Sequence, residues 1–174
     1  GPGNFLSDLI KSGKAKTTHL KEIYRQASGS GIIFNAHLVN SGKMPDTTPV
    51  PRERKSDFYW VDTDSPEDAS DLIVKLASSR IPKRFGMDPR RDIQILSPMN
   101  KGVCGAIALN KKLQETLNPD NHKKPQFRFG ETVFRAGDRV MQTSNNYDKS
   151  VFNGDMGRIY HINYEDKKFT VEYD

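Results

Sequence analysis

The spacing of apolar residues changes near residue 130, and this change limits the folds that the chain can adopt. Before that point, apolar residues at helical spacing alternate with short runs typical of strands. The expected helices are 4–13, 28–40, 65–77 and 103–117, and the expected strands are 17–20, 58–61 and 93–96. Parallel strands need a crossover connection, usually a helix, so the alternation predicts an α/β fold with a parallel sheet flanked by helices.

Local signals support the expected helices. The first has Asn4 as its cap, and its expected buried face consists of Phe5, Leu6, Leu9 and Ile10. The second has Ser28 or Ser30 at its cap, and the third begins with Ser65, a proline and two carboxylates, the order of a capped helix start. The buried face of the last expected helix comprises Val103, Ala106, Leu109, Leu113 and Leu117.

Residues 131–174 show a different pattern, made only of short β runs. These are 133–134, 140–141, 159–162 and 169–173, with a hairpin turn at 164–168. Residues 137–157 combine a short strand, a polar loop with one aromatic residue, an Asn-Gly-Asp turn and the start of another strand. Residues 81–91 and 119–130 are hydrophilic and are expected to be connectors.

The composition favours a polyanionic partner. The chain has 174 residues, a formal net charge of +5 and a sequence pI near 9.3, and clustered lysine and arginine release counterions when they meet phosphates. No apolar run is long enough to span a membrane, so we expect no membrane partner. The single cysteine, Cys104, cannot form an internal disulfide, which fits a reducing, cytoplasmic interior.

Two polar loops are candidates for binding nucleic acid. The loop with Asn100 and Lys101 lies between an expected strand and a helix, where backbone amides and a lysine favour an anion. In the second loop, Asn145 and Asn146 offer amides and Tyr147 offers a ring for stacking a base. The alternative is a structural loop whose asparagines bond their own backbone and whose tyrosine covers the strands.

These motifs together resemble the RecD/TraA (RecD2-like) family of superfamily 1 DNA helicases, which includes proteins called exodeoxyribonuclease V alpha subunits. The resemblance is carried by residues 137–157, by residues 93–119 and by Glu22-Ile23-Tyr24-Arg25-Gln26. It implies that residues 1–130 form the second RecA-like lobe, with a mobile loop at 42–57. Residues 131–174 would form part of an inserted SH3-like β-barrel, with three or four strands where such a barrel has about five.

The resemblance also implies roles for individual residues. Arg25 would be the catalytic arginine finger, because its guanidinium can hold two oxygens of a transferring phosphoryl group. Gly3, which closes a Gly-Pro-Gly motif, and Gln26 would lie with Arg25 at the bound ATP, and His37 would lie near DNA. The alternatives are a surface arginine in a salt bridge, a tag remnant at residues 1–2 and a structural histidine.

A phosphate-binding loop is missing from the sequence. Neither Gly13-Lys14 nor Gly42-Lys43 is followed by Ser or Thr, as the GxxxxGK[ST] motif requires. We therefore expect no ATPase activity from this chain alone. In the full-length enzyme, the first RecA-like lobe would make most of the contacts to ATP and Mg²⁺. We expect no metal site either, because Asp138, Asp148 and Asp155 lie in turn contexts.

The resemblance therefore implies a fragment of an ATP-dependent DNA helicase that would move 5′ to 3′ in unwinding, recombination or repair. Its expected partners are single-stranded DNA, duplex junctions, the first RecA-like lobe and other repair proteins. One alternative is a non-catalytic nucleic-acid-binding or adaptor module, and another is a nuclease. A reading frame that extends upstream through a phosphate-binding loop would favour the helicase.

Overall fold

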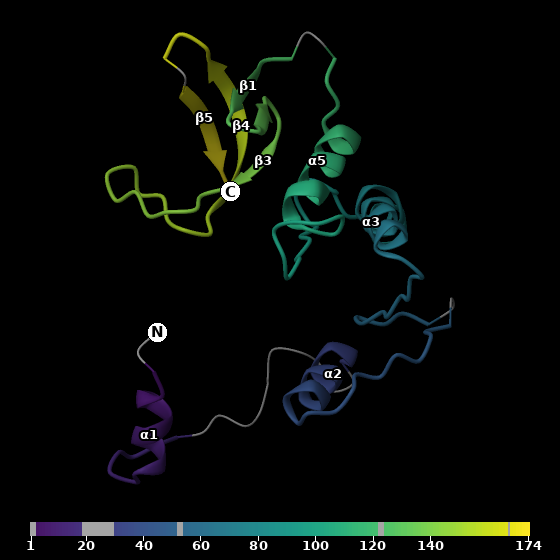
Figure 1. Cartoon of the computed structure of the whole chain (residues 1–174), viewed down its shortest axis with the longest axis vertical. Helices are drawn as coiled ribbons and strands as arrows, with labels where there is room; N and C mark the ends of the chain where they lie inside the picture. The colour runs from purple at the N-terminus through teal and green to yellow at the C-terminus, as the bar shows by residue number, and fades with distance from the viewer. Residues whose placement is uncertain (1–2, 19–29, 52–53, 122–123, 167) are drawn as a thin grey trace. The chain divides into compact units, whose positions relative to one another are not determined.

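The computed structural model describes residues 3–18, 30–51, 54–121, 124–166 and 168–174. The chain forms two compact units, Gly1–Val61 and Asp62–Asp174 (Figure 1). In the described residues, no helix is long and apolar enough to cross a membrane.

The first unit contains two helices, α1 (Phe5–Lys11) and α2 (Gly31–Asn40). The structure confirms Ser30 as the cap of α2, because its hydroxyl accepts a hydrogen bond from the backbone N–H of Ile33 at 3.3 Å. The prediction for α1 is confirmed for the helix but wrong for its buried face, since Phe5 and Leu6 are each 69% exposed. A seven-residue helix buries an apolar face only against another element, and none of the described residues covers this one.

The predicted strands 58–61 and 93–96 do not belong to any sheet in the described residues, while strand 17–20 lies partly outside them. The first segment includes Trp60 and Val61, which are 44% and 55% exposed, and the second includes Leu96, which is 88% exposed. A strand is defined by hydrogen bonds to a neighbouring segment, and the apolar pattern alone does not supply that neighbour. The predicted parallel sheet is therefore not seen in the described residues.

The second unit begins with a continuous helical run: α3 (Pro66–Lys75), the π-helical turn η1 (Leu76–Arg80) and α4 (Ile81–Phe85). The predicted cap is confirmed, since the Ser65 hydroxyl accepts from the N–H of Asp68 at 3.1 Å. The predicted connector at 81–91 is wrong for its first turn, which is helical. Pro82 has no N–H to donate, but in the first turn of α4 none is needed, so the helix restarts after the wider π turn.

Helix α5 (Ala106–Leu117) packs against α3, and Leu109 on its inner face is 3% exposed. Val103, predicted for the same face, precedes the helix and is 37% exposed. The residue before the helix must be small, because a Cβ at Gly105 would lie 2.4 Å from the carbonyl oxygen of Lys101. The turn at 99–105 therefore fixes where α5 begins.

Five strands follow: β1 (Gln126–Phe129), β2 (Thr132–Arg135), β3 (Arg139–Met141), β4 (Met156–Asn163) and β5 (Lys168–Tyr173). They form a two-stranded sheet, β1-β2, and a three-stranded sheet, β3-β4-β5, and all pairs are antiparallel. The predicted β runs at the last four strands are confirmed. Two predictions are wrong because of β1: part of the connector predicted at 119–130 is a strand, and the described strands number five instead of three or four.

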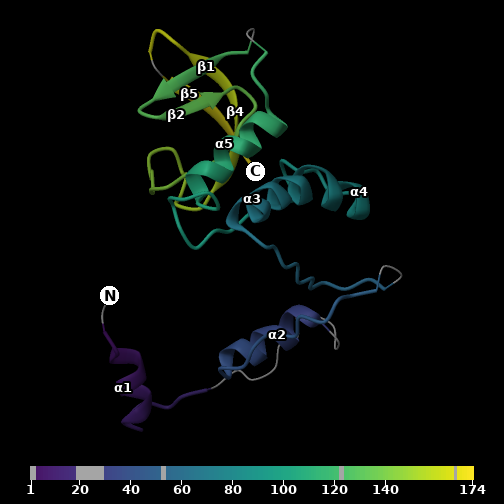
Figure 2. The ribbon, with the colours of Figure 1, turned by 45° about the vertical axis from the view of Figure 1, so that its right-hand side comes forward.

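The two sheets share a small apolar core, and Figure 2 shows β1 and β2 lying across β4 and β5. The ring of Phe169 lies 5.7 Å from that of Phe127 and 5.2 Å from that of Phe134, between ring centroids. Ile159 and Ile162 on β4 are 1% and 2% exposed. An irregularity in the β4-β5 register between residues 159 and 161 turns both isoleucines inward although they are three positions apart.

Candidate nucleic-acid interface

The loop of residues 142–155 joins β3 to β4, and we call it the arm. In Figure 1 it is the long yellow-green loop that projects from the end of the sheet. At its base, the N–H of Gln142 donates to the carbonyl of Asp155 at 2.8 Å, and the N–H of Gly154 donates back to Gln142 at 2.9 Å. Near its tip, Asn146 and Val151 exchange backbone hydrogen bonds of 2.7 and 3.1 Å. The arm is thus closed by backbone pairing at both ends.

The side-chain oxygens of the two predicted asparagines bond the arm itself. Asn145 Oδ1 accepts from the N–H of Asn153 at 2.9 Å, and Asn146 Oδ1 accepts from the N–H of Lys149 at 3.1 Å. This geometry matches the structural alternative for these two side chains. Their acceptor atoms hold the shape of the arm.

Tyr147 does not cover the strands, contrary to the structural alternative for this residue. It is 75% exposed, and its ring meets that of Phe152 edge to face with centroids 6.0 Å apart. The Nδ2 group of Asn145 donates to the Tyr147 hydroxyl at 3.3 Å. Phe152, which is 44% exposed, was not predicted as a site residue. An aromatic residue five positions after Tyr147 was the only sequence signal for it.

Below the arm, a polar network connects β2 and β3 to helix α5. Asp138 Oδ2 accepts from the N–H of Arg135 at 2.7 Å and from Gln114 Nε2 at 2.6 Å, and Asp138 Oδ1 accepts from Asn118 Nδ2 at 2.6 Å. The Arg135 side chain is 8% exposed and donates to the carbonyl of Asn118 at 3.1 Å and to Glu115 at 2.6 Å. Asp138 therefore lies in a turn, as predicted, and also ties the sheet to the helix.

Asn100 and Lys101 are exposed in the turn before α5. The first two N–H groups of the helix are already bonded, since Ala106 donates to the carbonyl of Met99 at 3.0 Å and Ile107 donates to that of Asn100 at 3.2 Å. These amides are not available to an anion, contrary to the argument from the sequence. The Lys101 side chain retains its charge on the surface, and its predicted role stays a prediction.

The remaining predicted residues belong to the first unit. Gly3 is exposed with φ +69°, in the turn before α1, and His37 is exposed in the last turn of α2. Arg25 and Gln26 lie outside the described residues. The roles predicted for Arg25 and Gln26 at the bound ATP therefore stay predictions.

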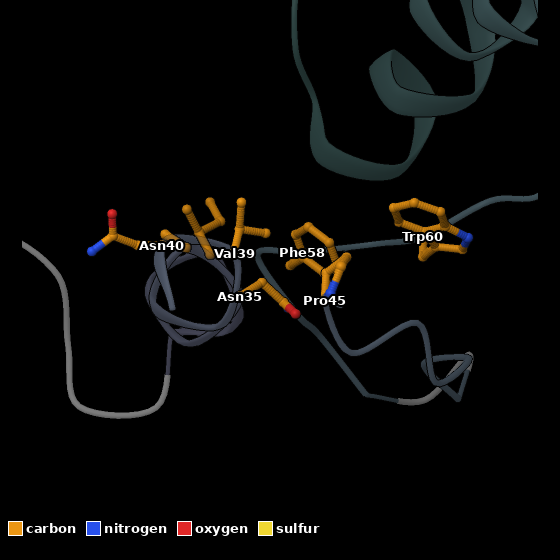
Figure 3. Close-up of a pocket in the computed structure, with 8 residues that line it drawn as sticks. Asn35, Val39, Asn40, Pro45, Phe58 and Trp60 are labelled. Carbon is orange, nitrogen blue, oxygen red and sulfur yellow. The ribbon is translucent and has the colours of Figure 1, made fainter. Parts of the chain in front are cut away.

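The first unit also has an apolar hollow beside α2 (Figure 3), lined by Ile32, Asn35, Ala36, Val39, Asn40, Pro45, Phe58 and Trp60. Pro45 and Phe58 lie next to each other beside the helix, and Asn40 points away from them. Asn35 is 6% exposed and fixes the following loop, because its Oδ1 accepts from the N–H of Asp46 at 2.5 Å. The hollow presents apolar surface with few polar groups.

Two carboxylates of the first unit are hydrogen-bonded at the ends of its long loop. The hydroxyl of Ser30 donates to Asp57 and holds the pKa of that carboxyl below its usual value. The hydroxyl of Thr48 likewise lowers the pKa of Asp46. In the part of the chain that the structure describes, no three His, Cys, Asp or Glu residues lie close enough together to hold a metal ion.

Comparison with known proteins shows which proteins the chain is similar to. The family model for the SH3 domain of ATP-dependent RecD-like DNA helicases matches residues 109–173, which contain most of α5 and all five strands. The chain is also 29% identical, over 160 residues, to the ATP-dependent RecD2 DNA helicase of Deinococcus radiodurans. That alignment covers 92% of this chain and 20% of the relative, so the chain spans about a fifth of the relative's length.

Proposed function

We propose that this chain, which is similar to RecD-like DNA helicases, serves as part of an ATP-dependent DNA helicase in which the arm contacts single-stranded DNA. The observation that carries the proposal is the exposed ring of Tyr147 on an arm held by its own hydrogen bonds. An ordered aromatic ring with an open face is what a stacked base requires.

Stacking fits the arm better than attraction to phosphates does. The arm has two carboxylates, Asp148 and Asp155, and one ammonium, Lys149, so its charge does not favour a polyanion. Stacking of a base on an aromatic side chain contributes about 1–3 kcal/mol and tolerates any sequence, because every base has a π face. A helicase must move along all sequences, and such a contact meets that requirement.

Within this proposal Asn145 and Asn146 are positioning residues. Their oxygens accept hydrogen bonds from two backbone N–H groups that follow Tyr147 in the arm, and the Asn145 amide donates to the tyrosine hydroxyl. Ring orientation is thereby set before DNA arrives, which reduces the ordering cost of binding.

The nucleotide chemistry belongs to the longer polypeptide. We propose that Arg25, with Gly3 and Gln26, meets ATP and Mg²⁺ held by a first RecA-like lobe, and that movement is 5′ to 3′. Replacing Arg25 by Ala in the full-length enzyme should strongly reduce the kcat of DNA-stimulated ATP hydrolysis, because a phosphoryl-transfer arginine contributes on the order of 10³-fold or more. An unchanged kcat would remove this role.

The arm is tested directly by fluorescence anisotropy with a labelled oligothymidylate. Tyr147→Ala should weaken binding by about 5- to 150-fold, the factor that corresponds to losing one stacked base. Tyr147→Phe should bind almost as well as the original chain, because the ring remains.

Tyr160 provides a matched control, since it is 76% exposed on β4 and lies outside the arm. Tyr160→Ala should bind the oligonucleotide within about twofold of the original chain, a change below 0.5 kcal/mol. Equal losses in Tyr147→Ala and Tyr160→Ala, or no loss in Tyr147→Ala, would refute the stacking role.

One observation favours a second candidate function, a non-catalytic adaptor module. The hollow beside α2 presents apolar side chains, with Val39 60% exposed, and apolar patches of this kind commonly mark interaction sites. An adaptor predicts that the gene encodes no phosphate-binding loop upstream, whereas the helicase requires one.

A further inference from the structure

A groove runs between two neighbouring helices of the second unit, α3 with its π turn and α5. The groove has a volume of about 810 Å³. Residues of both helices line it: Asp71, Val74, Lys75, Ser78, Ala108, Lys111, Lys112, Glu115 and Thr116. Most of these side chains are charged or hydroxylated. The groove therefore differs from the apolar hollow of the first unit.

Both carboxylates of the groove are already paired. Asp71 lies 2.7 Å from the ammonium of Lys112, which also donates to the hydroxyl of the fully buried Ser70 at 3.0 Å. Glu115 lies 2.6 Å from the guanidinium of Arg135. Each of these acidic groups therefore has a cationic partner within the unit.

Two cations remain, one on each side of the groove. Lys75 on α3 and Lys111 on α5 are exposed, and among the described residues neither lies within ion-pair distance of a carboxylate. Ser78, on the π turn, adds a hydroxyl to the lining of the groove. Turns of this type are frequent at functional sites.

The segment that begins at Lys75 also carries an excess of positive charge. Residues 75–91 contain six basic side chains and one acidic one, an excess equal to the net charge of the whole chain. The segment begins at Lys75 on the groove and continues through the π turn and α4. A polyanion at the groove would meet this field before contact.

We propose that the groove between α3 and α5 binds the phosphodiester backbone of the nucleic-acid strand whose base stacks on the arm. The inference rests on the proposed function, since it takes the same strand as ligand. It also supplies what the arm lacks: Tyr147 offers a ring without surplus positive charge, and the groove offers lysines without an aromatic ring.

The lining argues against an acidic protein as the partner. Stable protein interfaces depend on buried aromatic or other large anchors, whereas the only apolar side chains in this groove are Val74 and Ala108, both half-buried. Lysine ammonium groups act as point charges on phosphates and do not read bases. The contact should therefore be independent of sequence and sensitive to salt.

The salt dependence of binding provides the test. For single strands, log Kobs falls with log salt by about 0.7 per phosphate contacted. In the 174-residue chain, the double variant Lys75→Gln, Lys111→Gln should bind labelled oligothymidylate with a slope shallower by about 1.4. Lys75→Arg with Lys111→Arg should keep the original slope, because arginine preserves both charges.

Lys14→Gln with Lys43→Gln is the matched control, since it removes two exposed charges from the first unit. The control should leave the slope unchanged, and far-UV circular dichroism should show that both double variants remain folded. Equal slopes for the groove variant and the original chain would overturn the inference while Tyr147→Ala still reports on the arm. A chain that binds no oligonucleotide would overturn both proposals.

An acidic peptide resolves the remaining alternative. If poly-glutamate binds the original chain and the groove variant loses that binding while its oligonucleotide slope is unchanged, the groove serves a protein partner and our inference is wrong. If the groove variant loses slope with the oligonucleotide and poly-glutamate competes only weakly, the phosphodiester assignment stands.

Discussion

Asp138→Asn replaces one oxygen by an amide nitrogen of nearly the same size, at a carboxylate whose hydrogen-bond partners, one backbone group and two side chains, are all donors. These are the N–H of Arg135, the Nε2 group of Gln114 and the Nδ2 group of Asn118. Whichever way the new amide is turned, its NH₂ group faces at least one N–H. The orientation that loses least sets the amide against Asn118 and keeps the other two bonds.

Asn118 cannot relieve the conflict by turning its own side chain. Its Oδ1 accepts from the ammonium of Lys124, so a flip would direct an NH₂ group at that cation. The variant therefore loses one hydrogen bond to a charged acceptor, and the two remaining bonds go to a neutral one. Hydrogen bonds to charged groups contribute about 1.5–3 kcal/mol each, so we expect a total loss of about 2–4 kcal/mol in the free energy of unfolding.

Urea denaturation followed by circular dichroism measures this loss. With an m value of about 2 kcal/mol per molar, the midpoint should fall by about 1–2 M. Amide hydrogen exchange gives a local check at Ile159, whose N–H donates to the carbonyl of Asp138 at 2.9 Å. Its protection should fall in parallel.

Asp148→Asn makes the same chemical change at an exposed position on the arm. It should alter the free energy of unfolding by less than about 0.5 kcal/mol. If the two variants unfold at the same urea concentration, the network does not hold the sheet to α5, and the reasoning is refuted.

Three further predictions follow from single contacts. Gly105→Ala places a Cβ 2.4 Å from the carbonyl oxygen of Lys101, so the turn must shift and thermal unfolding should show a loss of about 1–3 kcal/mol. Ser30→Ala removes the hydroxyl that lowers the pKa of Asp57, so an NMR titration should show that pKa rising toward its usual value of about 3.9. Because the folded pKa of Asp57 is the lower one, its stabilising effect is present above the unfolded pKa and is lost as the pH falls through the folded pKa. Phe152→Ala removes the edge-to-face contact with Tyr147, which contributes about 0.5–1.5 kcal/mol. Its affinity for the oligonucleotide should fall by less than that of Tyr147→Ala.

Features that depend on a few neighbouring residues were predictable from the sequence. Ser30 and Ser65 cap their helices because a cap needs only the next three residues. The hairpin between β4 and β5 follows from two alternating apolar runs joined by a polar turn.

Features that depend on distant partners were not predictable. Residues 58–61 have the composition of a strand but belong to no sheet in the described residues. Strand β1 was missed because two of its four residues are polar, and it forms by pairing with β2. Helix α4 was missed because Pro82 is a helix breaker in most positions but is tolerated in a first turn.

The candidate site divides in the same way. Asn145 and Asn146 fit both a nucleic-acid contact and a structural role in the sequence, and only the positions of the Asn153 and Lys149 amides show how their oxygens are used. The exposure of Tyr147 depends on the fold of the whole arm, so neither composition nor spacing could establish it.

The arm and the groove are mechanically connected through strand β3. The arm leaves β3 at Met141, and the turn into β3 contains Asp138, whose carboxylate is bonded to Gln114 and Asn118 of the α5 region. Gln114 lies between groove residues Lys111 and Glu115 on the same helix. If one nucleic-acid strand contacts both Tyr147 and the groove lysines, as proposed, the two contacts are connected through the hydrogen bonds between β3 and the α5 region.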